Sequence, residues 1–77
     1  MRLIILSDPR KYLRKLADKE RQRLISAILA LPKGDVRPLV NEDSAFRLRV
    51  GDWRVMYHIK DGDIIIRKIG SRGDIYK

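Results

Sequence analysis

The sequence predicts a small α+β domain of order β-α-α-β-β-β, with two amphipathic helices packed on one face of an antiparallel sheet. Three observations lead to this prediction. Apolar residues recur at helical spacing between residues 12 and 31, they alternate with polar residues from residue 45 onward, and glycine-containing turns separate the alternating runs. A chain of 77 residues is expected to form one domain, over residues 1–77.

The amino-terminal half is predicted to hold one short strand and two helices. Residues 2–6 form an apolar, partly β-branched run that ends at Ser7-Asp8-Pro9. Asp8 is the expected N-cap of the first helix, with Pro9 at its first position, and Asp18 is the expected cap of the second. Basic residues between positions 10 and 23 are expected to form a solvated face. The apolar stripe of the second helix comprises Leu24, Ile25, Ile28, Leu29 and Leu31.

The carboxy-terminal half is predicted to be a three-stranded meander. Residues 32–44 contain two prolines and a glycine and have the composition of a loop. Strands are expected at 45–50, 53–60 and 63–69, joined by tight turns at Gly51-Asp52 and Asp61-Gly62. Gly70 is expected to end the last strand. The sheet side chains expected to face the helices are Phe46, Leu48, Val50, Val55, Tyr57 and Ile59.

Composition narrows the class of protein. The chain carries 18 Lys and Arg against 10 Asp and Glu, a net charge of +8, which favours polyanionic partners, chiefly nucleic acid. It has no cysteine and one histidine, so disulfides, thiolate chemistry and histidine metal clusters are excluded, and no cofactor is expected. The apolar run at residues 3–6 is too short for a signal peptide or a membrane span. A cytoplasmic protein with no membrane partner is therefore expected.

A group of arginines is predicted on the sheet face opposite the helices. Arg47, Arg49 and Arg54 alternate with the apolar residues of two adjacent strands, which lie about 5 Å apart. Because neighbouring like charges cost stability, an anionic ligand explains them better than folding does. Guanidinium groups match phosphate geometry and stabilise the extra negative charge of a pentacoordinate phosphorus.

Three more residues are candidates for the same site. Arg72 follows the third strand of the meander and is a natural fourth arginine, and Tyr76 could stack on a base or act on a ribose 2′-hydroxyl. His58 shares strand parity with Arg54, about 13 Å along the strand, and is a candidate for substrate binding. The alternative interpretation is a solvated basic face, with Tyr76 packed against an edge of the sheet.

Two segments resemble a known family. Residues 47–57, RLRVGDWRVMY, resemble the strand-turn-strand segment of the RelE/ParE toxin superfamily, and residues 69–76, IGSRGDIY, are similar to the ending of its RelE branch. The helix pair and residues 31–35, LPKGD, are also similar, so the resemblance covers nearly the whole chain. It implies a RelE-like fold and an mRNA interferase toxin of a type II toxin–antitoxin system.

The resemblance also implies a mechanism and partners. RelE-type members cleave mRNA in the ribosomal A site without a metal, by attack of the 2′-hydroxyl on the adjacent phosphate. Arg54, Arg72 and Tyr76 match the family's catalytic positions, and Arg47 and Arg49 match positions that hold the RNA backbone. The implied partners are an antitoxin protein, the ribosome with its mRNA, and operator DNA only through the antitoxin complex.

The chain departs from the family pattern at two places. Arg47 and Arg49 stand where some relatives have lysines, and Ser71 stands where many have histidine, so the general base is unassigned. Two alternatives therefore stay open: a ParE-like inhibitor of DNA gyrase, and a degenerate toxin that only binds its antitoxin and the operator. The ending from Arg72 to Tyr76 favours the nuclease.

Overall fold

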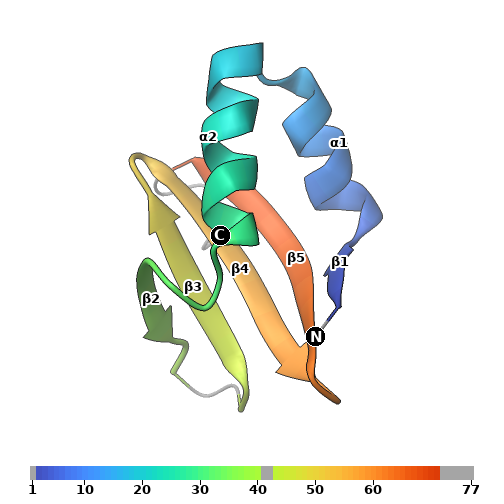
Figure 1. Cartoon of the computed structure of the whole chain (residues 1–77), viewed down its shortest axis with the longest axis vertical. Coiled ribbons are helices and arrows are strands. Elements are labelled where there is room, and N and C mark those ends of the chain that lie inside the picture. Colours follow the sequence, from blue (N-terminus) through green and yellow to red (C-terminus); the bar gives the residue numbers. More distant parts are fainter. Residues whose placement is uncertain (1, 41–42, 72–77) are drawn as a thin grey trace.

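Two helices lie on one face of a five-stranded sheet in the computed structural model, which describes residues 2–40 and 43–71 (Figure 1). The strand order across the sheet is β1-β5-β4-β3-β2. The predicted α+β class, with both helices on one face, is confirmed. In chain order the elements are β1 (Leu3–Ile5), α1 (Ser7–Lys15), α2 (Asp18–Leu29), β2 (Asp35–Pro38), β3 (Ala45–Val50), β4 (Trp53–Lys60) and β5 (Asp63–Ser71).

The sheet is mixed, so the prediction of a purely antiparallel sheet is wrong. β1 runs parallel to β5, with Leu3 opposite Ile64, whereas the other neighbouring strands are antiparallel. Tight turns reveal the direction of strands joined as hairpins, but β1 is connected to the sheet through both helices. Arg2, which precedes β1, forms an ion pair with Asp63 of β5 at an Nη2–Oδ2 distance of 2.9 Å. This ion pair links the residue just before the edge strand β1 to the neighbouring strand β5.

A strand lies within the segment that was expected to be a loop. β2 pairs antiparallel with β3, with Val36 opposite Leu48 and Pro38 opposite Phe46. Proline lacks the amide hydrogen of a ladder, but it is tolerated in this strand because β2 lies at the edge of the sheet. Only Val36 of the four residues is partly buried, so the segment has no alternating pattern by which a strand is recognised.

The first helix begins two residues earlier than predicted, at Ser7 instead of Pro9. Leu6, with extended backbone, takes the N-cap position, and its side chain cannot cap the helix. Asp8 and Pro9 are therefore the second and third residues of α1 instead of its cap and first residue. Proline fits there because the first amides of a helix have no partner within it. Pro9 and Leu13 are the buried residues of α1.

The apolar stripe of the second helix is narrower than predicted. Leu24 and Ile28 are buried at 0% and 2% exposure, whereas Ile25 and Leu29 are 37% and 69% exposed. Asp18 lies in the first turn, where it pairs with Arg21, and does not cap the helix. Two of the five predicted stripe residues thus face outward, and Leu31 lies beyond the end of α2, where it packs against the core. Neither helix in the described residues is long and apolar enough to cross a membrane.

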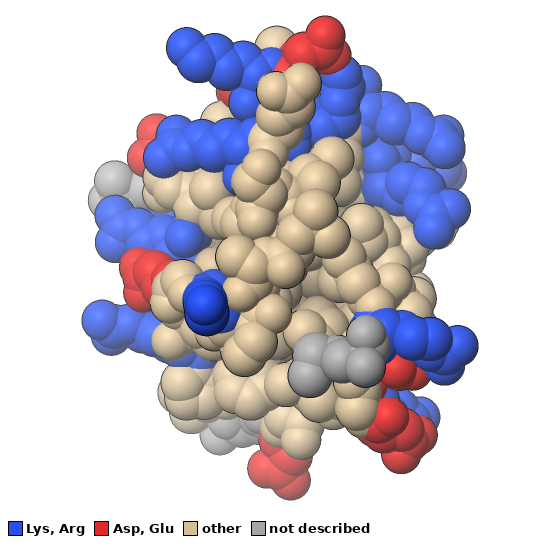
Figure 2. All heavy atoms as spheres, in the orientation of Figure 1, with Lys and Arg blue, Asp and Glu red and all other residues tan. Residues whose placement is uncertain are grey.

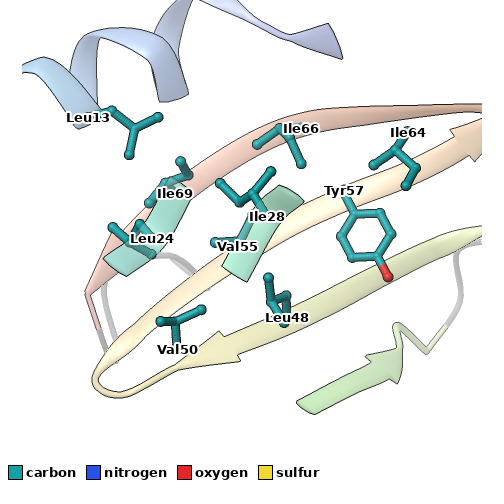
Figure 3. Close-up of a cluster of buried hydrophobic side chains, with 10 residues drawn as sticks. All are labelled: Leu13, Leu24, Ile28, Leu48, Val50, Val55, Tyr57, Ile64, Ile66 and Ile69. Atoms are coloured by element: carbon teal, nitrogen blue, oxygen red, sulfur yellow. The ribbon is translucent and has the colours of Figure 1, made fainter. Parts of the chain in front are cut away.

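The core fills the space between the helices and the sheet (Figure 3). The predicted inward-facing residues of β3 and β4 all belong to this core or pack against it, and the rings of Phe46 and Tyr57 stack at 5.4 Å between centroids. The cluster of buried hydrophobic residues comprises Leu13, Leu24, Ile28, Leu48, Val50, Val55, Tyr57, Ile64, Ile66 and Ile69.

A bulge in β5 brings a third isoleucine of that strand into the core. Met56 of β4 is opposite Lys68, but the next residue, Tyr57, is opposite Ile66, so Arg67 is the extra residue. Ile66 and Ile69 are therefore both buried although they are three positions apart. β5 continues through Gly70 to Ser71, beyond the predicted end of the strand.

Candidate functional site

Three arginines lie on the sheet face that the helices leave uncovered: Arg47 and Arg49 of β3, and Arg54 of β4, here called the sheet arginines. They alternate with buried Leu48 and Val55, which point toward the helices. Arg49 and Arg54 are directly opposite each other across the two strands. Since the Cβ atoms of such pairs are about 5 Å apart, two guanidinium side chains start side by side near the β3–β4 turn.

The Arg54 side chain folds back onto that turn. Its Nη1 atom donates hydrogen bonds to the carbonyl oxygens of Gly51 at 3.3 Å and Trp53 at 3.2 Å. Gly51 suits the turn, because its φ of +58° is less favourable for most residues with a side chain. The two backbone bonds place one edge of the Arg54 guanidinium at the end of the β3–β4 hairpin.

Arg47 belongs to a second row of basic residues across the strands, next to the row that holds Arg49 and Arg54. Arg37 of β2 is opposite Arg47, and Met56 separates Arg47 from Lys68 of β5. The Nε atom of Arg47 is buried and has no hydrogen-bond partner in the described part of the chain. The sequence alone does not reveal that Arg37 and Lys68 lie on this face. Arg37 stands in a segment that was expected to be a loop, and the face of Lys68 depends on the bulge in β5.

Few acidic groups accompany the sheet arginines. Asp35 of β2 lies opposite Arg49, and Asp52 is part of the β3–β4 turn. Among residues 2–40 and 43–71, neither carboxylate forms an ion pair with a sheet arginine. The positive charge at this end of the sheet therefore remains available to an anion from outside the protein.

His58 lies on the same face but apart from the arginine pair. Its neighbours across the strands are Ala45 and Ile65, so its immediate surroundings are apolar. Its Nδ1 atom is buried without a partner in the residues that the structure describes. Four residues of strand, about 13 Å, separate His58 from Arg54. The structure thus does not bring this candidate together with the paired arginines.

Arg72 and Tyr76, the remaining candidates, lie outside the described residues. The last described residues of β5 run beside the arginine pair: Gly70 is opposite Arg54, and Ser71 is opposite Trp53. The end of β5 therefore reaches the same end of the sheet as the β3–β4 turn.

This arrangement suits the binding of phosphate. Guanidinium groups form bidentate, charge-assisted hydrogen bonds with phosphate oxygens, and adjacent ones stabilise negative charge that develops during a reaction. Guanidinium groups carry a positive charge and several hydrogen-bond donors, so the sheet arginines offer an anion both charge and hydrogen bonds.

Comparisons with known proteins agree on the family. Residues 6–76 match the family model described as the ParE toxin of the type II toxin–antitoxin system parDE. No curated protein sequence matches the chain significantly.

Solved structures of antitoxin–toxin complexes contain chains of the same fold. The Methanococcus jannaschii RelB–RelE complex matches with a TM-score of 0.79 and 21% identity, over 95% of this chain and 94% of that one. The Pyrococcus horikoshii RelE–RelB complex matches with a TM-score of 0.75 and 27% identity, over 95% and 96%. The Mycobacterium tuberculosis RelBE2 complex matches with a TM-score of 0.73 and 22% identity, over 92% and 96%.

The family model spans nearly the whole chain, and the matched solved structures cover more than nine-tenths of it with the same fold. The chain therefore belongs to the ParE toxin family of type II toxin–antitoxin systems, within the RelE/ParE superfamily that residues 47–57 resemble.

Proposed function

We propose that this toxin is an endoribonuclease that cleaves mRNA in the ribosomal A site without a metal. The observation that carries the proposal is the directly opposed pair of Arg49 and Arg54 beside the β3–β4 turn, which has no ion-paired acid in the described residues. Nearby like charges are unfavourable for folding, and a bound phosphodiester removes that cost. The RelE-like ending at residues 69–76 supports the nuclease branch.

The main requirement of the reaction is stabilisation of the negative charge that develops on the phosphate in the transition state. The 2′-oxygen loses its proton and attacks the adjacent phosphorus, the bond to the 5′-oxygen breaks, and that oxygen gains a proton. The products are a 2′,3′-cyclic phosphate and a 5′-hydroxyl. Arg54 contacts the scissile phosphate in this proposal, and Arg47 and Arg49 hold the backbone. Arg72 stabilises the charge of the transition state and Tyr76 orients the substrate nucleotide.

An antitoxin keeps the toxin inactive, and operator DNA is bound only through their complex. The helix side of the molecule offers it an area without charged side chains, bordered mostly by lysine and arginine and in places by aspartate and glutamate (Figure 2). A groove of about 320 Å³ lies between the end of α2 and β1. Exposed Leu29 and Leu3 line it, together with Arg2, whose guanidinium is paired with Asp63. An acidic, amphipathic antitoxin segment matches this combination of apolar and basic surface.

Inhibition of DNA gyrase is the second candidate. It is favoured by one observation, the description of the matching family model as a ParE toxin. A gyrase inhibitor binds its target and performs no chemistry on a phosphate. The paired arginines would then serve binding alone. A gyrase supercoiling assay with the purified toxin distinguishes the two candidates, because only a gyrase inhibitor reduces supercoiling.

The proposal is tested first by growth arrest in cells that express the toxin from a tightly controlled promoter. Arg54→Ala removes the contact to the scissile phosphate and is expected to abolish the arrest. Arg14→Ala is the matched control, because it removes the same charge from an exposed position on α1. Arrest by a soluble, folded Arg54→Ala protein would contradict the assignment of Arg54.

A further inference from the structure

A third arginine reaches the β3–β4 turn from the other side of the sheet. A Cβ atom built on Gly51 would lie 3.1 Å from both Nη atoms of Arg23 and 3.2 Å from its Cζ atom. Because the three distances are nearly equal, the flat face of the Arg23 guanidinium covers Gly51. Arg54 contacts the carbonyl oxygen of the same residue at 3.3 Å. Guanidinium groups from α2 and from β4 thus meet at one glycine.

The absence of a side chain at position 51 leaves room for this contact. A Cβ atom there would lie in tight contact with the Arg23 guanidinium, which would have to shift by a few tenths of an ångström. Gly51 therefore serves two purposes: it adopts a positive φ in the turn, and it lets a cation from the helix layer approach the hairpin.

Arg23 keeps its hydrogen-bonding capacity. Its side chain is exposed, and it has no hydrogen bond or ion pair with another residue of the described part of the chain. The planar face of its guanidinium rests on the turn, and its donors have no protein partner among the described residues. A guanidinium that is held by its face, with its edge free, is well prepared to bind an oxyanion.

We propose that Arg23 binds a phosphate of the RNA strand next to the one held by Arg54. The RNA backbone then continues from the open sheet face, over the β3–β4 turn, and onto the amino-terminal half of α2. This inference rests on the proposed nuclease function and adds a contact outside the sheet. It separates Arg23 from Arg21, which is partly buried and paired with Asp18, and from the basic residues of the helices that are exposed to solvent.

The test is the salt dependence of binding to a 12-nucleotide, fluorescein-labelled RNA with 2′-O-methyl groups, which prevent cleavage. Each phosphate contact with a single strand contributes about 0.7 to the slope of log affinity against log salt. Arg23→Ala is expected to reduce the slope by about that amount, so that the affinity ratio between 50 and 200 mM salt falls by about 2.6-fold. Arg23→Lys is expected to retain the slope.

Arg14→Ala, with the same loss of charge on α1, is the matched control and is expected to leave the slope unchanged. Equal slopes for Arg23→Ala and the wild type would overturn the inference, as would equal reductions in Arg23→Ala and Arg14→Ala. Cleavage of A-site mRNA by the wild type is measured in parallel. Cleavage with an unaltered Arg23→Ala slope refutes only the Arg23 contact, whereas absence of cleavage refutes the proposed function on which it rests.

Discussion

Replacing Arg49 with threonine is expected to stabilise the fold. Arg49 and Arg54 are directly opposite each other, and a pair of like charges in that position destabilises a sheet by roughly 0.2–1 kcal/mol. Threonine removes the repulsion and suits a strand. Asp35 lies opposite Arg49 on the other side but forms no ion pair with it among the described residues, so the substitution breaks no ion pair that would offset the gain. For a domain of this size 1 kcal/mol changes Tm by about 4–8 °C, so the expected rise is about 1–8 °C.

Thermal unfolding at two salt concentrations separates the charge effect from the strand preference of threonine. The repulsion is screened when the Debye length falls from about 10 Å at 0.1 M to about 3 Å at 1 M salt, whereas strand preference is not. The gain in Tm of Arg49→Thr is therefore expected to shrink at 1 M salt. Arg49→Lys, which keeps the charge, is the control and is expected to show no such salt-dependent gain.

A different result would refute the reasoning about the sheet arginines. If Arg49→Thr gives no gain at 0.1 M salt, or a gain that salt does not reduce, the arginine pair does not cost the fold any stability. The argument that these residues are present for an anionic ligand would then lose its physical basis.

Two further predictions concern the fold. Leu24 is fully buried between the helices and the sheet, so Leu24→Ala is expected to lower the free energy of unfolding by about 2–5 kcal/mol in urea titrations; a loss below about 1 kcal/mol would contradict its place in the core. The hydrogen bond from Arg2 holds the pKa of Asp63 below its ordinary value of 3.8. A lowered pKa gives stability that is present above the unfolded-state pKa and is lost as the pH falls through the folded-state value. Asp63→Asn is therefore expected to be less stable than the wild type at pH 6, with the difference fading below about pH 4; a difference that stays constant from pH 6 to pH 3 would contradict the ion pair.

The parts of the fold that were predictable are those with a strong local pattern. Alternation over β3 and β4, with turns at Gly51 and Asp61-Gly62, identifies the hairpins and the face of each residue. β2 was not predictable, because its pairing with β3 is a tertiary contact made by a segment with little buried surface. The direction of β1 was not predictable either, because its pairing with β5 is also a tertiary contact.

The candidate site was predictable only in part, for related reasons. Strand parity is enough to place Arg47, Arg49 and Arg54 on one face. The Arg23 contact depends on how α2 lies over the hairpin, which no spacing in the sequence reveals. The position of Lys68 depends on a bulge, and bulges shift the parity of every residue that follows.

The most direct test of the central claim is cleavage of end-labelled mRNA on programmed 70S ribosomes, with free mRNA alongside. The wild type is expected to cut within the A-site codon only on the ribosome, leaving a 2′,3′-cyclic phosphate. Arg54→Ala is expected to reduce the rate by about 10²–10³-fold, the usual cost of losing one charge-stabilising donor. Absence of cleavage at every codon, or equal rates for Arg54→Ala and the wild type, would contradict the account.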